Sequence, residues 1–153
     1  MGLDNVVVAV GSGDEDRLEE IVETATDLAG PAGAAIKLVH VFARDEYDRI
    51  RDQLDIDADD EVSPDEVAKR HVTIRKLGDA MDAAGLTYSW HGRICDDDDA
   101  QGDEIVAAAS DLGADLLVVG GRRRSPTGKA VFGSTAQDVM LDAPCPVTFV
   151  RAD

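Results

Sequence analysis

The sequence of 153 residues predicts an α/β fold, in which helices cover both faces of an open, five-stranded parallel sheet. Two runs, at residues 5–10 and 115–120, are apolar after their first residue and are typical of strands that are buried on both faces. Strand-like and helix-like segments alternate along the chain, and right-handed crossovers between parallel strands build such a sheet. The length and the 44% of hydrophobic residues suit one domain, residues 1–153, with a single core.

Apolar spacing and turn residues define each element. Apolar residues recur at helical spacing from 14 to 28, and Gly30-Pro31 is expected to end that helix. Residues 86–94 alternate polar and apolar side chains, which is typical of an edge strand, whereas the two most apolar strands should lie in the centre of the sheet. In chain order we expect a strand at 5–10, a helix at 14–28, a strand at 35–42, a single helix from 67 to near Gly85, a strand at 86–94, a helix at 101–112, a strand at 115–120, a helix at 133–141 and a strand at 146–150.

The charge balance excludes two classes of function. The chain has 24 Asp against 8 Glu, 11 Arg against 4 Lys, and a formal net charge of -17, which argues against a generally basic nucleic-acid binder or a binder of anionic membranes. Short, strongly hydrated carboxylates suit a surface in concentrated salt, which screens their repulsion, so we predict the intracellular, cytoplasmic protein of a halophile. No run approaches the roughly 18 apolar residues of a membrane span, and we expect no targeting segment.

Open parallel sheets bind ligands beyond the carboxyl ends of their strands, at the point where the strand order reverses. The residues that follow the two most apolar strands are Gly11-Ser12 and Gly120-Gly121. We therefore expect these two pairs to lie in loops that face a ligand.

The segment between Asp115 and Asp138 contains no acidic residue, although the chain is acidic elsewhere. It follows a buried strand and ends in Gly133-Ser134-Thr135, where a helix is expected to begin. Glycines allow a ligand to approach the backbone closely, and helix N-terminal N–H groups and hydroxyls donate to anions. The segment predicts a phosphate ligand held by Arg122, Arg123, Arg124 and Lys129. The alternative is a solvated basic loop that pairs with acidic groups elsewhere on the surface or on a second subunit.

Other residues with metal-binding or nucleophilic chemistry predict no site. His40, His71 and His91 fall on a strand, a helix and another strand, and their spacing does not converge on one metal ion. Cys95 and Cys145 lack CxxC spacing, so we expect buried free thiols rather than a zinc cluster or a disulfide framework. No Gly-x-Ser-x-Gly elbow is present to indicate acyl transfer.

Several segments carry a family resemblance; they are Val6–Val10 with Gly11-Ser12, Leu38–Val41, and Val118–Gly120 through Gly133-Ser134-Thr135 to Cys145-Pro146-Val147. With them the sequence resembles the universal stress protein (UspA-like) family over essentially its whole length, as an acidic member of haloarchaeal type. The resemblance implies a sheet in the order 3-2-1-4-5 and a homodimer that is often formed by pairing of the last strand. An apolar edge such as Val147–Val150 independently favours a partner, because an uncovered edge strand promotes aggregation.

The nucleotide motif of the family is kept only in part. Members that bind ATP carry Gly-x2-Gly-x9-Gly-Ser/Thr after the fourth strand; here Gly120 and Gly133-Ser134 match, and Arg123 replaces the middle glycine. The Asp that typically ends the first strand of such members is Gly11 here, and the nearest carboxylate is that of Asp14. The guanidinium group of an arginine nonetheless offers several N–H donors that can bind a phosphate. A retained family site would consist of Val10, Gly11, Val41, Val119, Gly120, Gly121, Arg122, Arg123, Arg124, Lys129, Gly133, Ser134 and Thr135, with the adenine against Val41 and the phosphates against the glycines and basic residues.

These inferences lead to two functional hypotheses. The first is a cytoplasmic stress-response protein that binds an adenine nucleotide, ATP or AMP, with or without Mg²⁺, and hydrolyses it weakly or not at all because no general base lies beside the basic segment. The second is a nucleotide-free dimeric module of the same fold that acts through an acidic protein partner. Both expect a second copy of the chain as a partner, and neither expects nucleic acid or a membrane.

Overall fold

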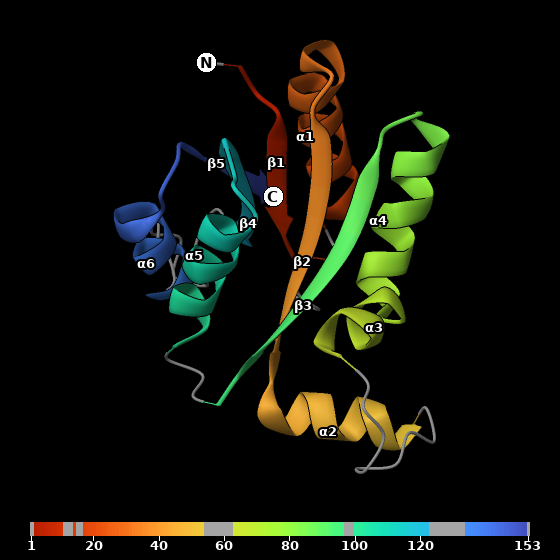
Figure 1. Ribbon diagram of the computed structural model, residues 1–153, viewed down its shortest axis with the longest axis vertical. Helices are drawn as coiled ribbons and strands as arrows, with labels where there is room; N and C mark the ends of the chain where they lie inside the picture. Colours follow the sequence, from red (N-terminus) through yellow and green to blue (C-terminus); the bar gives the residue numbers. More distant parts are fainter. Residues whose placement is uncertain are drawn as a thin grey trace.

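The computed structural model of the protein describes residues 2–10, 14, 17–53, 63–96, 100–122 and 134–152. Its five strands form one parallel sheet in the order β3-β2-β1-β4-β5 (Figure 1), which confirms the predicted fold class and strand order. The strands are β1 Asn5–Ala9, β2 Ala35–Ala43, β3 Tyr88–Cys95, β4 Leu116–Arg122 and β5 Val147–Ala152. The helices are α1 Leu18–Ala32, α2 Arg44–Gln53, α3 Pro64–Lys69, α4 Val72–Ala83, α5 Gln101–Asp111 and α6 Ser134–Asp142.

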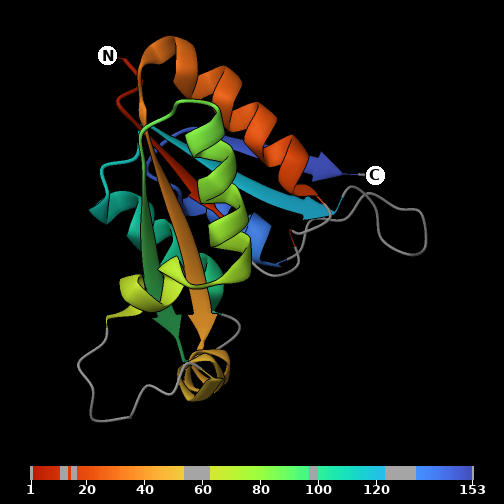
Figure 2. The same ribbon diagram turned by 90° about the vertical axis from the view of Figure 1, so that its right-hand side faces the viewer.

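The central strand β1 is buried on both faces, as its continuous apolar run predicts. Val8 packs with Ile21 of α1 and Leu77 of α4 in one core cluster. Val7 packs on the opposite face with Val139 of α6 in a second cluster. Figure 2 shows the resulting layers, with α1 and α4 in front of the sheet and α5 and α6 behind it.

A third, smaller core lies beyond the carboxyl end of the central strand. β1 pairs with β2 as far as Ala9 and Val39, whereas β2 continues beside β3 to Ala43. Phe42, at this end of β2, is buried together with Tyr47 of α2 and two residues of α3. Figure 1 shows α2 lying across this end of β2 and β3, away from the two main helical layers.

The helix α2 was not predicted. Tyr47 is its one residue buried in the protein, so the segment has no apolar stripe that would mark it as a helix in the sequence. Its polar residues form the helix because β2 delivers the chain to a point where Tyr47 can pack against Phe42.

Two helix boundaries also differ from the prediction. The first helix continues through Gly30-Pro31 and ends before Gly33, whose φ of 66° is the left-handed conformation that favours glycine at a helix C-terminus. The expected single helix from residue 67 is two helices, because His71 takes an extended conformation and its side chain accepts a hydrogen bond from the N–H of Thr73 at the start of α4. No described helix is long and apolar enough to cross a membrane.

Candidate functional site

The predicted site residues of the first, second and fourth strands lie at one edge of the sheet. Val10 directly follows β1, and its N–H donates to the carbonyl oxygen of Val39 over 2.9 Å. Val41 of β2 and Val119 of β4 belong to the core cluster that faces α5 and α6, whereas Val10 belongs to the cluster on the other face. Because parallel strands share one carboxyl edge, the structure brings these residues to the place where the strand order reverses between β1 and β4.

Asp14 is the residue at this edge that the predicted set omits. It is 8% exposed, and its Oδ1 accepts a hydrogen bond from Arg17 Nε over 2.6 Å, in an ion pair one turn before α1. A Cβ added to Gly120 would lie 2.7 Å from Asp14 Oδ1 and 3.0 Å from Arg17 Nε. The missing side chain of Gly120 therefore makes room for a buried carboxylate between the ends of β1 and β4.

The prediction that Gly120-Gly121 lies in a loop is wrong. Both glycines and Arg122 belong to β4, in which Gly120 pairs with Val150 and Arg122 with Ala152 of β5. The strand is longer than expected because β5 runs beside it to Ala152 and supplies main-chain partners.

The remaining predicted residues fall into two groups. Gly11, Arg123, Arg124, Lys129 and Gly133 lie outside the described residues, as do Ser12 and the side chains of Arg122 and Ser134. Ser134 and Thr135 form the first turn of α6. That turn packs closely on α5, where a Cβ on Gly102 would meet the Thr135 carbonyl oxygen at 3.1 Å.

A second cluster of functional groups lies beside Val10. His40 of β2 and His71 stack with their ring centroids 4.1 Å apart and 28° between their planes. His40 Nε2 lies 2.9 Å from Oε1 of Glu46 on α2, and this hydrogen bond lowers the pKa of Glu46 despite its partial burial. The prediction that the histidines lie apart is wrong for this pair. The packing of α3 and α4 on the sheet brings His71 onto His40, and sequence spacing does not indicate this contact.

His40, Glu46 and His71 each offer a ligand atom, and these atoms lie within 4.8 Å of one another. A metal ion held by two histidines lies close to the plane of both rings, along a nitrogen lone pair of each. Here the two rings are stacked, with 28° between their planes. Nδ1 of His71 also accepts a hydrogen bond from the N–H of Thr73 over 3.2 Å. Nδ1 of His71 is therefore already engaged in capping α4.

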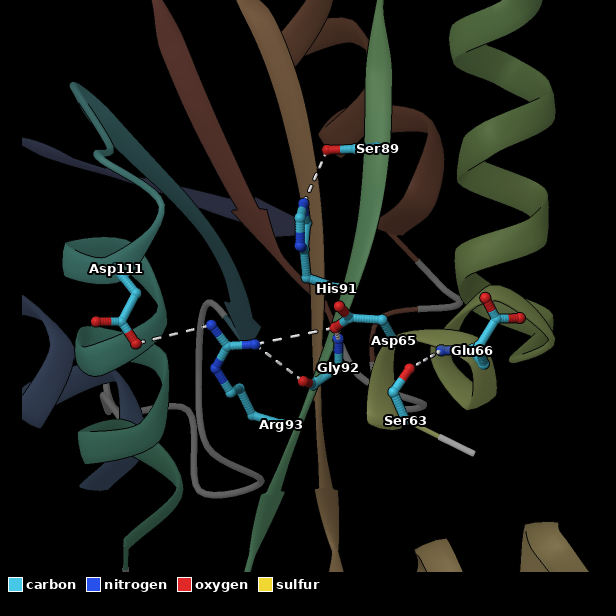
Figure 3. A network of polar contacts seen from close by, with 8 residues as sticks. All are labelled: Ser63, Asp65, Glu66, Ser89, His91, Gly92, Arg93 and Asp111. Carbon is cyan, nitrogen blue, oxygen red and sulfur yellow. Dashed lines mark hydrogen bonds and ion pairs between the residues drawn. The ribbon is translucent and has the colours of Figure 1, made fainter. Parts of the chain in front are cut away.

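The polar residues of β3 make a separate network that supports the fold (Figure 3). The Gly92 N–H donates to Asp65 Oδ1 of α3 over 2.8 Å, and the Arg93 guanidinium lies between Asp65, at 3.9 Å, and Asp111 of α5, at 3.8 Å. Ser89 and His91 form a hydrogen bond on the same strand, and burial lowers the pKa of His91. This network joins the edge strand to helices on both faces of the sheet.

Both cysteines are free thiols, as predicted. Cys95 is buried at the end of β3, and Cys145 is half-buried before β5. Burial raises the pKa of the Cys145 thiol, which makes it less reactive than an exposed thiol.

Comparison with known proteins identifies the family. The model of the universal stress protein family matches residues 2–151. A universal stress protein of Mycolicibacterium smegmatis is 43% identical over 49 residues, so the matched part spans 32% of this chain and 38% of that relative.

Solved structures share the fold. A universal stress protein from Archaeoglobus fulgidus is 28% identical, with a TM-score of 0.72 over 96% of this chain and 98% of that one. A universal stress protein in complex with cAMP is 20% identical, with a TM-score of 0.68 over 100% of both chains. One from Archaeoglobus fulgidus in complex with dAMP is 22% identical, with a TM-score of 0.66 over 98% of this chain and 99% of that one. Given the family match over residues 2–151 and this shared fold, the chain belongs to the universal stress protein family.

Proposed function

We propose that this protein binds an adenine nucleotide in the crevice between the carboxyl ends of β1 and β4. The observation that carries the proposal is the buried carboxylate of Asp14, which lies against the backbone of Gly120 where the strand order reverses. Open parallel sheets bind their ligands at this position. The relatives solved with cAMP and with dAMP, both adenine nucleotides, support the choice of ligand class.

In this proposal Asp14 takes the role of the aspartate that Gly11 replaces. Its carboxylate accepts hydrogen bonds from the ribose hydroxyls, while Val41 lies against the base. The ion pair with Arg17 offsets the charge of Asp14, so the carboxylate does not repel the phosphates. The groups that hold the phosphates are the side chains of Arg122, Arg123, Arg124 and Lys129 and the N-terminal turn of α6 with Gly133, Ser134 and Thr135.

The basic segment is tested by equilibrium binding of labelled ATP, with AMP as the comparison, in molar KCl with and without Mg²⁺. Replacing Arg122, Arg123 and Arg124 together with alanine should weaken ATP binding by more than tenfold, because charge-assisted hydrogen bonds to phosphate are lost. A variant that removes the same charge from exposed residues of the α3–α4 region, R70A/R75A/K76A, should bind within about twofold of the parent. Equal affinities of the two variants, or no saturable binding by folded protein, would contradict the proposal.

Gly120→Ala tests the crevice itself. The three atoms nearest to the new Cβ belong to the side chains of Asp14 and Arg17, which can move, so we expect the free energy of unfolding to change by less than about 1 kcal/mol. Nucleotide affinity should fall at least tenfold, because the carboxylate is displaced from its position between the strands. Gly30→Ala is the matched control, since its Cβ meets only Leu86 Cδ2 at 4.0 Å. Unchanged nucleotide affinity in Gly120→Ala would show that Asp14 is not part of the nucleotide site.

A second candidate function rests on the departures at Gly11 and Arg123 from the nucleotide motif. In that case the protein is a nucleotide-free module whose basic segment contacts an acidic protein partner. The binding experiment separates the two functions, because this one predicts folded protein that does not bind ATP.

We also propose a homodimer and an intracellular, salt-adapted role in the stress response. The outer edge of β5 faces away from β4, and Leu141 of the neighbouring helix α6 is 82% exposed, which gives this side of the molecule an apolar surface suited to a second copy. The net charge of -17 supports adaptation to concentrated salt. Nucleotide turnover is slow or absent in this proposal, because the nearby carboxylate of Asp14 is engaged by Arg17.

A further inference from the structure

The buried ring of His40 is held between two hydrogen-bond acceptors. Its Nδ1 lies 2.8 Å from the carbonyl oxygen of Val10, and its Nε2 lies 2.9 Å from Oε1 of Glu46. His40 is 2% exposed, so its ring has little access to water. Both distances are those of hydrogen bonds, so each contact needs a proton between its two atoms.

A neutral imidazole has one N–H, whereas these two contacts need two donated protons. A carbonyl oxygen only accepts, so the proton towards Val10 belongs to Nδ1 of His40. An ionised carboxylate also only accepts, so the contact with Glu46 requires a second proton on His40 or one on Glu46 itself. We propose that His40 and Glu46 hold one proton more than a neutral imidazole and a carboxylate, and that this proton fastens α2 to the sheet in a pH-dependent manner.

The surroundings place this proton on His40. The pKa of Glu46 is lowered, mainly through its hydrogen bond with His40, which favours the ionised carboxylate. Beside an ionised Glu46, both contacts of His40 need a proton from the ring. The other charged or titratable groups that act on Glu46 are His71, at the junction of α3 and α4, and Arg49, on α2 itself. Nδ1 of His71 accepts a hydrogen bond from the Thr73 N–H, so this nitrogen carries no proton, and the ring stacks on that of His40.

The contacts form a chain from β1 through β2 to α2. The Val10 carbonyl binds one side of His40, and Glu46 on the first turn of α2 binds the other. Loss of the proton leaves the Nε2 lone pair facing the carboxylate, which replaces an attraction with a repulsion. Because the contact between Nε2 and Glu46 needs this proton, the stability that the pair contributes is lost when the proton leaves at higher pH, and α2 loosens first.

Glu46→Gln is the informative variant. The amide group that this substitution introduces can donate to an unprotonated Nε2, so a neutral His40 satisfies both contacts without the additional proton. We would measure urea unfolding from pH 6 to pH 9 and the protonation of each ring nitrogen by ¹⁵N NMR, in molar KCl, for both proteins. The unfolding constant of the parent should rise by up to tenfold per pH unit relative to Glu46→Gln, as expected for one linked proton. Amide protection of α2 should fall in the parent over the same range and stay constant in Glu46→Gln.

His71→Asn tests whether the additional proton is on His40 rather than on His71. Asparagine retains an oxygen that can cap α4 but does not titrate, so the pH dependence of the parent should persist in this variant. The proposal is overturned if His40 has a single N–H in the parent at pH 7, if Glu46→Gln keeps the pH dependence, or if His71→Asn abolishes it. A one-to-one stabilisation by Zn²⁺ that Glu46→Gln removes would also overturn it, because it would identify a metal site. The test is independent of nucleotide binding, which these measurements do not include.

Discussion

Gly92→Ala is expected to lower the free energy of unfolding by about 3 kcal/mol or more, because the site has no room for a methyl group. A Cβ at this position would lie 2.1 Å from the carbonyl oxygen and 2.6 Å from the carbonyl carbon of Pro64, and 3.2 Å from the Cβ of Ala68. The first two atoms are backbone of α3, so no side-chain rotation relieves the clash. The substitution would push α3 away from β3 and lengthen the 2.8 Å hydrogen bond from Gly92 to Asp65.

Urea unfolding in molar KCl, followed by circular dichroism, measures this effect. Gly2→Ala is the control, since a Cβ there meets nothing within 4 Å, and it should change stability by less than about 0.5 kcal/mol. Similar stabilities of the two variants would mean that α3 shifts along β3 at little cost. The close approach of these two elements would then contribute little to the stability of the fold.

Phe42→Ala should cost about 3–5 kcal/mol, the usual range for removing a fully buried phenylalanine. The Phe42 ring meets the edge of His40 with centroids 4.4 Å apart and the Tyr47 ring with centroids 5.5 Å apart. Its loss leaves a cavity where β2, α2 and α3 join. We therefore expect α2 to lose amide protection in addition to the fall in global stability.

Two further variants serve as comparisons for Phe42→Ala. Phe42→Leu retains much of the buried volume and should cost less than half as much as Phe42→Ala. Val72→Ala removes an apolar side chain that is 51% exposed and should be nearly neutral. A small effect of Phe42→Ala would show that the third core cluster contributes little to the fold.

The strands could be predicted from the sequence because burial on both faces leaves a continuous apolar run. Val6 to Val8 of β1 and Leu117 to Val118 of β4 have no exposed surface, and their positions in the sheet follow from that. The strand order itself required the family resemblance, since apolar runs say which strands are central but not which edge each outer strand takes. The helix α2 could not be found this way, because Tyr47 is its one buried residue and only Ile50 joins it against a core cluster.

The sequence predicts where a candidate site would lie, but not which of its residues come together. Glycines at the ends of two apolar strands indicate the carboxyl edge of the sheet, where Val10 and Val119 lie, and the sequence shows Asp14 as the carboxylate nearest to Gly11. Its position against Gly120 depends on the register of β1 on β4, with Ala9 opposite Val119, and no local pattern encodes that register. The stacking of His40 on His71 likewise depends on how α4 packs, which is a property of the assembled layers.

The order of the strands has a consequence for synthesis of the chain on the ribosome. β1 emerges first and becomes the centre of the sheet, and β2 and then β3 add outward on one side before β4 and β5 add outward on the other. Each new strand therefore joins an existing edge, and none must be inserted between two strands that are already paired. The second edge of β1 pairs with Leu116 to Val119, so it stays unpaired until most of the chain has been made. An unpaired strand edge can associate with other nascent chains.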